Sequence, residues 1–138
     1  MNGKTVFVDT SGFFALLDGD DQYHHVASQK WNLIFEEHAQ LITTDYVRLE
    51  CWALLQRRLG ARAVLTFQED FLSACEIYHI SEAEFQEAAR GWHMHHRRKL
   101  SLVDLTSFYC MHRLHLHEVL TFDKHFIEHG FQITGSLS

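Results

Sequence analysis

The distribution of apolar positions predicts short strands that alternate with amphipathic helices. The run Thr5–Val8 is β-branched and aromatic throughout, which favours a strand buried on both faces, as in the middle of a parallel sheet. The run ends at Asp9, and a short polar turn leads to apolar residues at helical spacing between Phe13 and Leu17. An acid therefore follows directly on the strand that we expect to be central.

The rest of the chain repeats this alternation. Further strands are expected at 40–43, 76–80 and 118–122, with an edge strand at 131–134. Helices are expected at 20–39, 46–59, 61–74, 82–96, 102–115 and 123–129, with Gly60 and Gly130 as stops. Because this alternation is typical of a parallel sheet with helices on both faces, we predict an α/β fold.

Length and composition narrow the classes of protein. A chain of 138 residues is expected to form one domain, over residues 1–138, and it contains no apolar run long enough to cross a membrane. The N-terminus lacks a secretory pattern, and Cys51, Cys75 and Cys110 are typical of reduced core thiols, so we expect a cytoplasmic protein. A net charge of −6 argues against a generic basic nucleic-acid binder, but it allows an enzyme that concentrates acids in a metal site.

Four acids stand at positions where burial is expected. Asp9 and Asp123 each follow a predicted strand, and parallel neighbouring strands would bring both to the same sheet edge, where ligands bind in open α/β sheets. Glu50 and Asp104 lie on otherwise apolar helix faces. Since Asp and Glu are rarely buried unpaired, the set needs an explanation.

Each acid also has a purely structural interpretation. Asp9 and Asp123 are placed to cap the helices that follow them, and Asp104 has the spacing of a capping motif with Ser101. Glu50 is able to pair with an arginine, for which Arg48, Arg57 and Arg113 are candidates. A single divalent cation would explain all four acids together, and Mg²⁺ and Mn²⁺ favour carboxylate ligands.

These residues stand in a pattern that resembles a PIN domain, and among PIN domains the small VapC-type toxin ribonucleases. The matching segments are FVDTSGFFALL with Asp9, TTDYVRLEC with Glu50, SLVDLTSFYCM with Asp104 and VLTFDKHF with Asp123. The resemblance covers nearly the whole chain. It implies a three-layer α/β/α sandwich with a central parallel sheet, metal-dependent cleavage of RNA, frequently a homodimer, and for toxin members a small antitoxin partner.

The resemblance gives the acids roles in phosphodiester hydrolysis. Asp9 and Asp104 are expected as the principal Mg²⁺ or Mn²⁺ ligands, with Asp123 binding directly or through water. Glu50 is expected to orient the attacking water or to accept its proton. Ser11 and Thr121 are expected at the same edge as supporting hydroxyls, although small polar residues are also common in turns. Many family members carry a further acid near the position of His125, and its absence here questions a second metal.

The segment between His93 and Lys99 is the basic part of an acidic chain. Arg97, Arg98 and Lys99 lie just before the helix of Asp104, where we expect them to contact RNA phosphates. The alternative is a solvated helix end whose cations suit the helix dipole. The histidines at 93, 95 and 96 do not converge on one helix face, which disfavours a zinc or nickel site.

Other functional classes stay open at this point. A PIN-like fold that acts through a protein partner without nuclease turnover would keep the same acids, and so would an RNA-processing nuclease without an antitoxin. A phosphoryl-accepting receiver domain also gathers acids at a sheet edge, but it needs an acceptor Asp after a middle strand and a Lys after the last, which this chain does not supply.

Overall fold

A computed structural model describes residues 3–95 and 99–135, without the side chain of His95. Its centre is a five-stranded sheet in the order β3-β2-β1-β4-β5, with every neighbouring pair parallel. The strands are β1 (Thr5–Val8), β2 (Gln40–Thr44), β3 (Glu76–Tyr78), β4 (Glu118–Leu120) and β5 (Gln132–Ile133). The strand that the apolar run predicted to be central, β1, is central.

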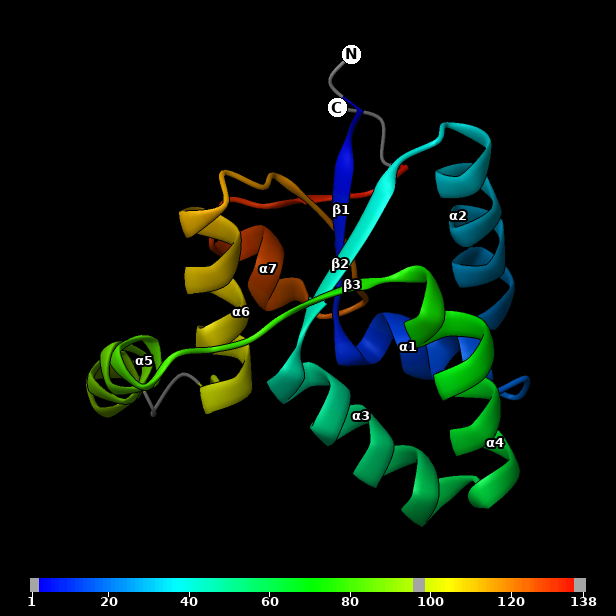
Figure 1. The fold of residues 1–138 in the computed structure, drawn as a ribbon, viewed down its shortest axis with the longest axis horizontal. Helices are drawn as coiled ribbons and strands as arrows, with labels where there is room; N and C mark the ends of the chain where they lie inside the picture. Colours follow the sequence, from blue (N-terminus) through cyan, green and yellow to red (C-terminus); the bar gives the residue numbers. More distant parts are fainter. Residues whose placement is uncertain (1–2, 96–98, 136–138) are drawn as a thin grey trace.

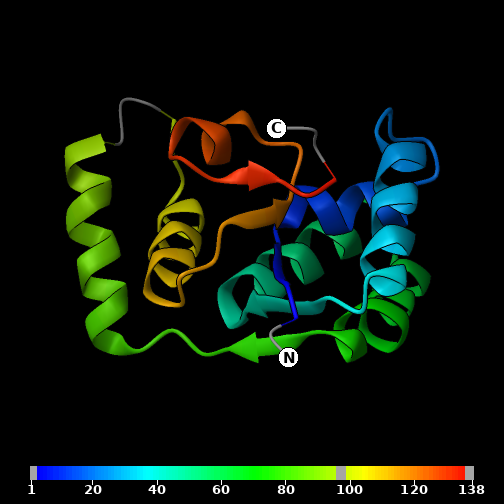
Figure 2. The same cartoon turned by 90° about the horizontal axis from the view of Figure 1, so that it is seen from above.

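Helices lie on both sides of the sheet. They are α1 (Thr10–Leu17), α2 (His24–Glu36), α3 (Asp45–Arg58), α4 (Ala61–Thr66), α5 (Glu82–His95), α6 (Leu102–Arg113) and α7 (Lys124–Glu128). Figure 1 and Figure 2 show α5, α6 and α7 on one side of the strands and α1, α2 and α4 on the other. The predicted three-layer α/β/α arrangement with a central parallel sheet is confirmed.

The register of the central strands brings distant residues to one edge. Val8 of β1 is paired with Leu120 of β4, so Asp9 and Thr121 leave the sheet side by side, and the Asp9 amide donates to the Leu120 carbonyl oxygen (3.2 Å). Helix α1 approaches β4 so closely that a Cβ atom on Gly12 would collide with that same carbonyl group. Gly12 therefore permits the contact that holds the start of α1 against the end of β4.

The predicted helix over 61–74 is wrong as a continuous α-helix. Helix α4 is followed by a π-helical turn, η1 (Phe67–Phe71), and a 3₁₀ turn, η2 (Leu72–Ala74). Phe67 is fully buried against Phe13, at 5.0 Å between ring centroids, and Phe71 packs on Trp31. The extra residue in the π turn rotates the chain so that both aromatic side chains face apolar partners.

Helix α2 begins later than predicted, at His24 and not near Asp20. The carboxylate of Asp21 accepts a hydrogen bond from the Tyr23 amide (2.8 Å), and this local turn competes with helix formation. None of the helices in residues 3–95 and 99–135 combines the length and the apolar character that a membrane span requires.

Candidate active site

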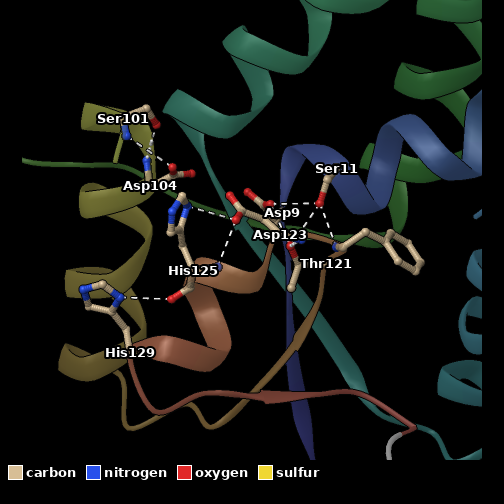
Figure 3. Close-up of polar contacts among 9 residues, drawn as sticks. Asp9, Ser11, Ser101, Asp104, Thr121, Asp123, His125 and His129 are labelled. Atoms are coloured by element: carbon tan, nitrogen blue, oxygen red, sulfur yellow. Dashed lines mark hydrogen bonds and ion pairs between the residues drawn. The ribbon is translucent and has the colours of Figure 1, made fainter. Parts of the chain in front are cut away.

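The carboxyl edge of the sheet holds Asp9 in a network of hydroxyl groups. Asp9 is only 4% exposed, and its Oδ2 atom accepts hydrogen bonds from Thr121 (2.9 Å) and Ser11 (3.2 Å). The two hydroxyl oxygens lie 3.0 Å apart, and they also accept the amides of Phe122 and Asp123. Figure 3 shows these groups meeting between β1 and the turn after β4. Ser11 and Thr121 thus lie where the sequence placed them, as direct partners of Asp9.

The other three acids come to the same pocket from separate elements. An open pocket of about 510 Å³ is bordered by Asp9, Glu50 of α3, Asp104 of α6 and Asp123, which precedes α7. Its other lining residues are Thr10, Ser11, Phe14, Asp21, Tyr23, Leu54, Arg58, Ser101 and Phe122. The structure therefore brings together all four acids that the sequence selected.

The capping interpretation fits some of the acids and not others. The Asp9 side chain makes no capping hydrogen bond to α1. Asp123 does cap α7, because its Oδ1 accepts from the His125 amide (3.0 Å). Asp104 forms a full capping box with Ser101, since each side chain accepts the other residue's amide, at 2.9 and 3.2 Å. Two of these acids therefore cap a helix and border the pocket at the same time.

The partner of Glu50 is a hydroxyl group, whereas the structural interpretation of the sequence expected an arginine. Its Oε1 atom accepts from Thr10 Oγ1 at 2.7 Å, and no ion pair of Glu50 is found within residues 3–95 and 99–135. Arg113 pairs instead with Glu84. Thr10 immediately follows Asp9, so α1 connects two acids that are far apart in sequence.

Burial and mutual repulsion raise the pKa of two acids. Burial, followed by repulsion from Asp104, raises the pKa of Asp9 to about 7 from its ordinary value of 3.8, even though the Thr121 hydroxyl opposes the shift. The pKa of Asp104 is also raised, first by burial and then by the charges of Asp123 and Glu50, against its hydrogen bonds with Ser101. Carboxylates arranged in this way favour a cation between them.

His125 stands near the position where many family members carry an acid, and it offers an imidazole nitrogen in place of a carboxylate. Potential ligand atoms of Asp104, Asp123 and His125 all lie within 4.8 Å of one another (Figure 3). The Nδ1 atom of His125 is buried and has no hydrogen bond among the described residues, although it lies 3.0 Å from Oδ1 of Asp123, within ion-pair distance. The sequence indicated His125 only as a position where many family members carry an acid, and its proximity to Asp104 and Asp123 is set by the tertiary structure.

The predicted RNA-binding tract falls mostly beyond the structure. Arg97 and Arg98, like His96, lie outside the described residues, as does the side chain of His95. Lys99 is exposed and has a positive φ of 61°, at the turn before the Ser101 cap. The contact of this tract with RNA stays a prediction. No motif pointed to three further residues that border the pocket: Arg58 at the end of α3, Tyr23 just before α2 and Phe122 just after β4.

Comparison with known proteins identifies the family. The model of the PIN domain family matches residues 6–132. The 23S rRNA-specific endonuclease VapC20 of Mycobacterium tuberculosis is 34% identical over 128 residues, which cover 91% of this chain and 95% of that protein.

Solved structures agree with the sequence comparison. The crystal structure of Mycobacterium tuberculosis VapC20, described as a sarcin–ricin loop cleaving toxin, superposes with a TM-score of 0.82 at 30% identity, covering 92% of this chain and 96% of that one. PAE2754 from Pyrobaculum aerophilum superposes with a TM-score of 0.60 at 19% identity, covering 95% and 89%, and supports the fold alone. The chain therefore belongs to the PIN domain family and, within it, to the VapC group.

Proposed function

We propose that this protein is a Mg²⁺- or Mn²⁺-dependent endoribonuclease, acting as the toxin of a toxin–antitoxin pair. The observation that carries the proposal is the convergence of four carboxylates on one pocket: within residues 3–95 and 99–135, no Lys or Arg forms an ion pair with any of them, and Asp123 alone has an ion-pair contact, with Nδ1 of His125 at 3.0 Å. Like charges gathered this way destabilise the folded protein unless a cation binds. The match to VapC20 supports RNA as the substrate.

The residues present fit a divalent cation. Asp104 and Asp123 supply hard oxygen ligands, and the buried Nδ1 atom of His125 supplies a nitrogen with no other hydrogen bond among the described residues. The Nδ1 atom of His125 lies 3.0 Å from Oδ1 of Asp123, so one bound cation would be held by both groups. Borderline nitrogen ligands suit Mn²⁺ better than Mg²⁺, so His125 favours manganese.

When bound, the cation would lower the pKa of a water molecule and offset charge on the phosphate. The protein's own groups do the rest. Asp9, held by Ser11 and Thr121 at the same pocket, is proposed as a principal ligand together with Asp104, as the sequence predicted. Thr10 fixes Oε1 of Glu50, and Oε2 has no hydrogen bond among the described residues, so it is free to accept the proton of the attacking water.

Cleavage assays with and without metal test the proposal. The substrates are a hairpin RNA carrying the sarcin–ricin loop of 23S rRNA and a hairpin of equal length with a scrambled loop. We expect cleavage with Mn²⁺ or Mg²⁺ and none in excess chelator. Asp9→Asn should lower the rate about a hundredfold or more, since even partners of metal ligands are worth 10–100-fold.

Two results would contradict the proposal. Undiminished cleavage in chelator, or by Asp9→Asn, would remove the metal mechanism. A hairpin that is bound but never cleaved with either metal would favour the protein-binding module instead. Thermal unfolding of Asp9→Asn in chelator shows that the variant is folded.

Partners and location follow from the same proposal. We expect a small antitoxin to copurify when its neighbouring reading frame is expressed together with this chain, and we expect a homodimer by sedimentation. Reduced Cys51, Cys75 and Cys110 suit a cytoplasmic enzyme, because all three thiols have raised pKa values from burial and none forms a disulfide. Purification of the natural complex, followed by mass spectrometry, would identify the antitoxin, and a nuclease without one would be an RNA-processing enzyme.

A further inference from the structure

Two stacked aromatic rings border the acidic pocket. Tyr23, at the start of α2, lies parallel to Phe122, which follows β4, with ring centroids 4.6 Å apart and an interplanar angle of 5°. Both residues line the pocket that holds the four acids. Tyr23 remains 41% exposed, while Phe122 is half-buried beneath it. The pocket thus combines carboxylates with an accessible aromatic surface.

The backbone on both sides of this pair is fixed. The Phe122 amide donates to Ser11 Oγ at 2.9 Å, which ties it to the network around Asp9. The Tyr23 amide donates to Asp21 Oδ1 at 2.8 Å, and the Tyr23 carbonyl oxygen accepts from the Ala27 amide at 2.8 Å. Because the backbone is held at both residues and the two rings already stack on one another, the pair forms a preorganised surface, and binding to it costs little conformational entropy.

The charge of the pocket explains why an aromatic surface would be useful. The chain carries a net charge of −6, and among the described residues that line the pocket Arg58 is the single Lys or Arg. An acidic pocket repels the phosphates of RNA until a cation binds. Stacking of a base on an aromatic ring does not depend on charge, and it tolerates any base because every base has a π-face.

Burial of Phe122 is the simpler explanation of the pair. If Tyr23 only covered Phe122, apolar contact between the two rings would be enough, and Tyr23 would not need to be exposed on the pocket wall. The exposure of Tyr23 and its place on the pocket wall go beyond that requirement. Phe122 also directly precedes Asp123, a proposed ligand of the cation. A base stacked on this pair would therefore lie close to the scissile phosphate at that cation.

We propose that Tyr23 and Phe122 form a stacking platform for one unpaired nucleobase next to the scissile phosphate, with Arg58 contacting the RNA backbone. This inference rests on the proposed ribonuclease function and refines its substrate class. A base can reach the platform only when it is not paired in a duplex, so the platform selects loops and single strands.

Binding measurements test the platform without turnover. All proteins carry Glu50→Gln to prevent cleavage, and affinity for the sarcin–ricin hairpin is measured by fluorescence anisotropy with Mn²⁺ present. Tyr23→Leu should weaken binding roughly 5- to 150-fold, the equivalent of 1–3 kcal/mol, and Tyr23→Trp should restore it. The matched control is Phe35→Leu, which removes a 48% exposed aromatic ring from the far end of α2 and should leave affinity unchanged.

An abasic scan separates stacking from a merely structural role. Each loop nucleotide is replaced in turn by an abasic one, and one position should weaken binding to the parent protein about as much as Tyr23→Leu does. At that position the two losses should not add. The platform would be overturned if, at every position, the fold-losses from Tyr23→Leu and from the abasic nucleotide multiplied when combined. It would also be overturned if the parent protein tolerated every abasic site.

The remaining outcomes distinguish the two proposals. Unchanged affinity of Tyr23→Leu, with normal cleavage by the otherwise native protein, would overturn the platform alone. A hairpin that is neither bound nor cleaved by the native protein would overturn the ribonuclease function and the platform together. Because the abasic scan uses the native Tyr23, a parent protein that tolerates every abasic site would overturn the platform even if Tyr23→Leu does not fold.

Discussion

Both ends of the parallel sheet carry acids, two beside Lys4 at the amino end and four around the pocket at the carboxyl end, but their charges are compensated differently. At the amino end, Lys4 Nζ lies 3.0 Å from Glu37 and 3.4 Å from Glu118, so one cation serves two carboxylates. This end borders a pocket of about 680 Å³, larger than the 510 Å³ pocket at the carboxyl end. At the carboxyl end, within the described chain, no Lys or Arg pairs with the four converging acids.

The candidate active site is therefore distinguished by acids that no Lys or Arg of the described chain compensates, and not by the size of its cavity. The pKa of Lys4 is raised, chiefly by its hydrogen bond to Glu37, which is the response of a satisfied pair. The pKa of Asp9 is raised to about 7 by burial and by Asp104, which is the response of an acid that lacks a partner charge.

The largest expected effect is a pH dependence at the carboxyl end. Folded Asp9 has a pKa of about 7 and unfolded Asp about 3.8, so between these values the folded state binds more protons. The free energy of unfolding of the metal-free protein should therefore fall as pH rises from about 4 to 7, by at most about 1.4 kcal/mol per pH unit for one proton.

Urea unfolding in chelator at pH values from 4 to 8 measures this slope, and Asp9→Asn should reduce it. Added Mn²⁺ should reverse the trend, because metal binding needs the deprotonated carboxylates. An identical slope in the native protein and in Asp9→Asn would contradict an uncompensated Asp9.

The second effect compares two capping boxes. Asp104 with Ser101 and Glu84 with Ser81 have the same local geometry, but the pKa of Asp104 is raised and that of Glu84 is lowered. Burial acts on both acids, yet for Glu84 it is outweighed by hydrogen bonds from Tyr78 and Ser81 and by Arg113. Neutralising the two acids should therefore change stability in opposite directions.

At neutral pH in chelator, Asp104→Asn should raise the melting temperature by about 2–5 °C, and Glu84→Gln should lower it. Asp104→Asn should also reduce the stabilisation that Mn²⁺ gives by binding the folded state. A lower melting temperature for Asp104→Asn, with an unchanged response to Mn²⁺, would mean that Asp104 is only a capping residue.

A third, smaller effect tests whether His125 belongs to the metal site. His125→Asn should weaken Mn²⁺ binding about tenfold and reduce the preference for Mn²⁺ over Mg²⁺. Pulsed electron paramagnetic resonance of bound Mn²⁺ should show coupling to an imidazole nitrogen in the native protein, and this coupling should be absent from His125→Asn. His112→Asn is the control, and persistent nitrogen coupling in His125→Asn would exclude His125 as a ligand.

The smallest effect is expected at the amino end. The Lys4 side chain is 36% exposed, so solvent screens its pairs, and Lys4→Met should cost no more than about 1 kcal/mol of stability. Because the Lys4 pKa is raised in the folded state, this contribution is present below the pKa of an unfolded lysine and is lost as pH rises above it. Thermal unfolding at several pH values measures the stability loss and its pH dependence. The cleavage assay tests the other end of the sheet, and a slower cleavage rate for Lys4→Met would show that the two ends are coupled.

Local residue patterns determined the elements and the identity of the acids. Thr5–Val8 predicted a buried central strand because β-branched and aromatic side chains fit a sheet covered on both faces, and the polar residue that ends the run is Asp9. The alternation of strands and helices then required a parallel sheet whose carboxyl ends share one edge. These conclusions depend only on interactions between near neighbours in sequence.

Tertiary structure decided what each acid contacts, because those contacts join elements far apart in the chain. The pairing of Val8 with Leu120 places Thr121 against Asp9, and the packing of α1 on α3 places Thr10 against Glu50. His125 of α7 also lies near Asp104 of α6, and Tyr23 stacks on Phe122, and neither contact has a local signature. Sequence fixes the residues of a site through local propensity, while strand register and helix packing fix the distances between them.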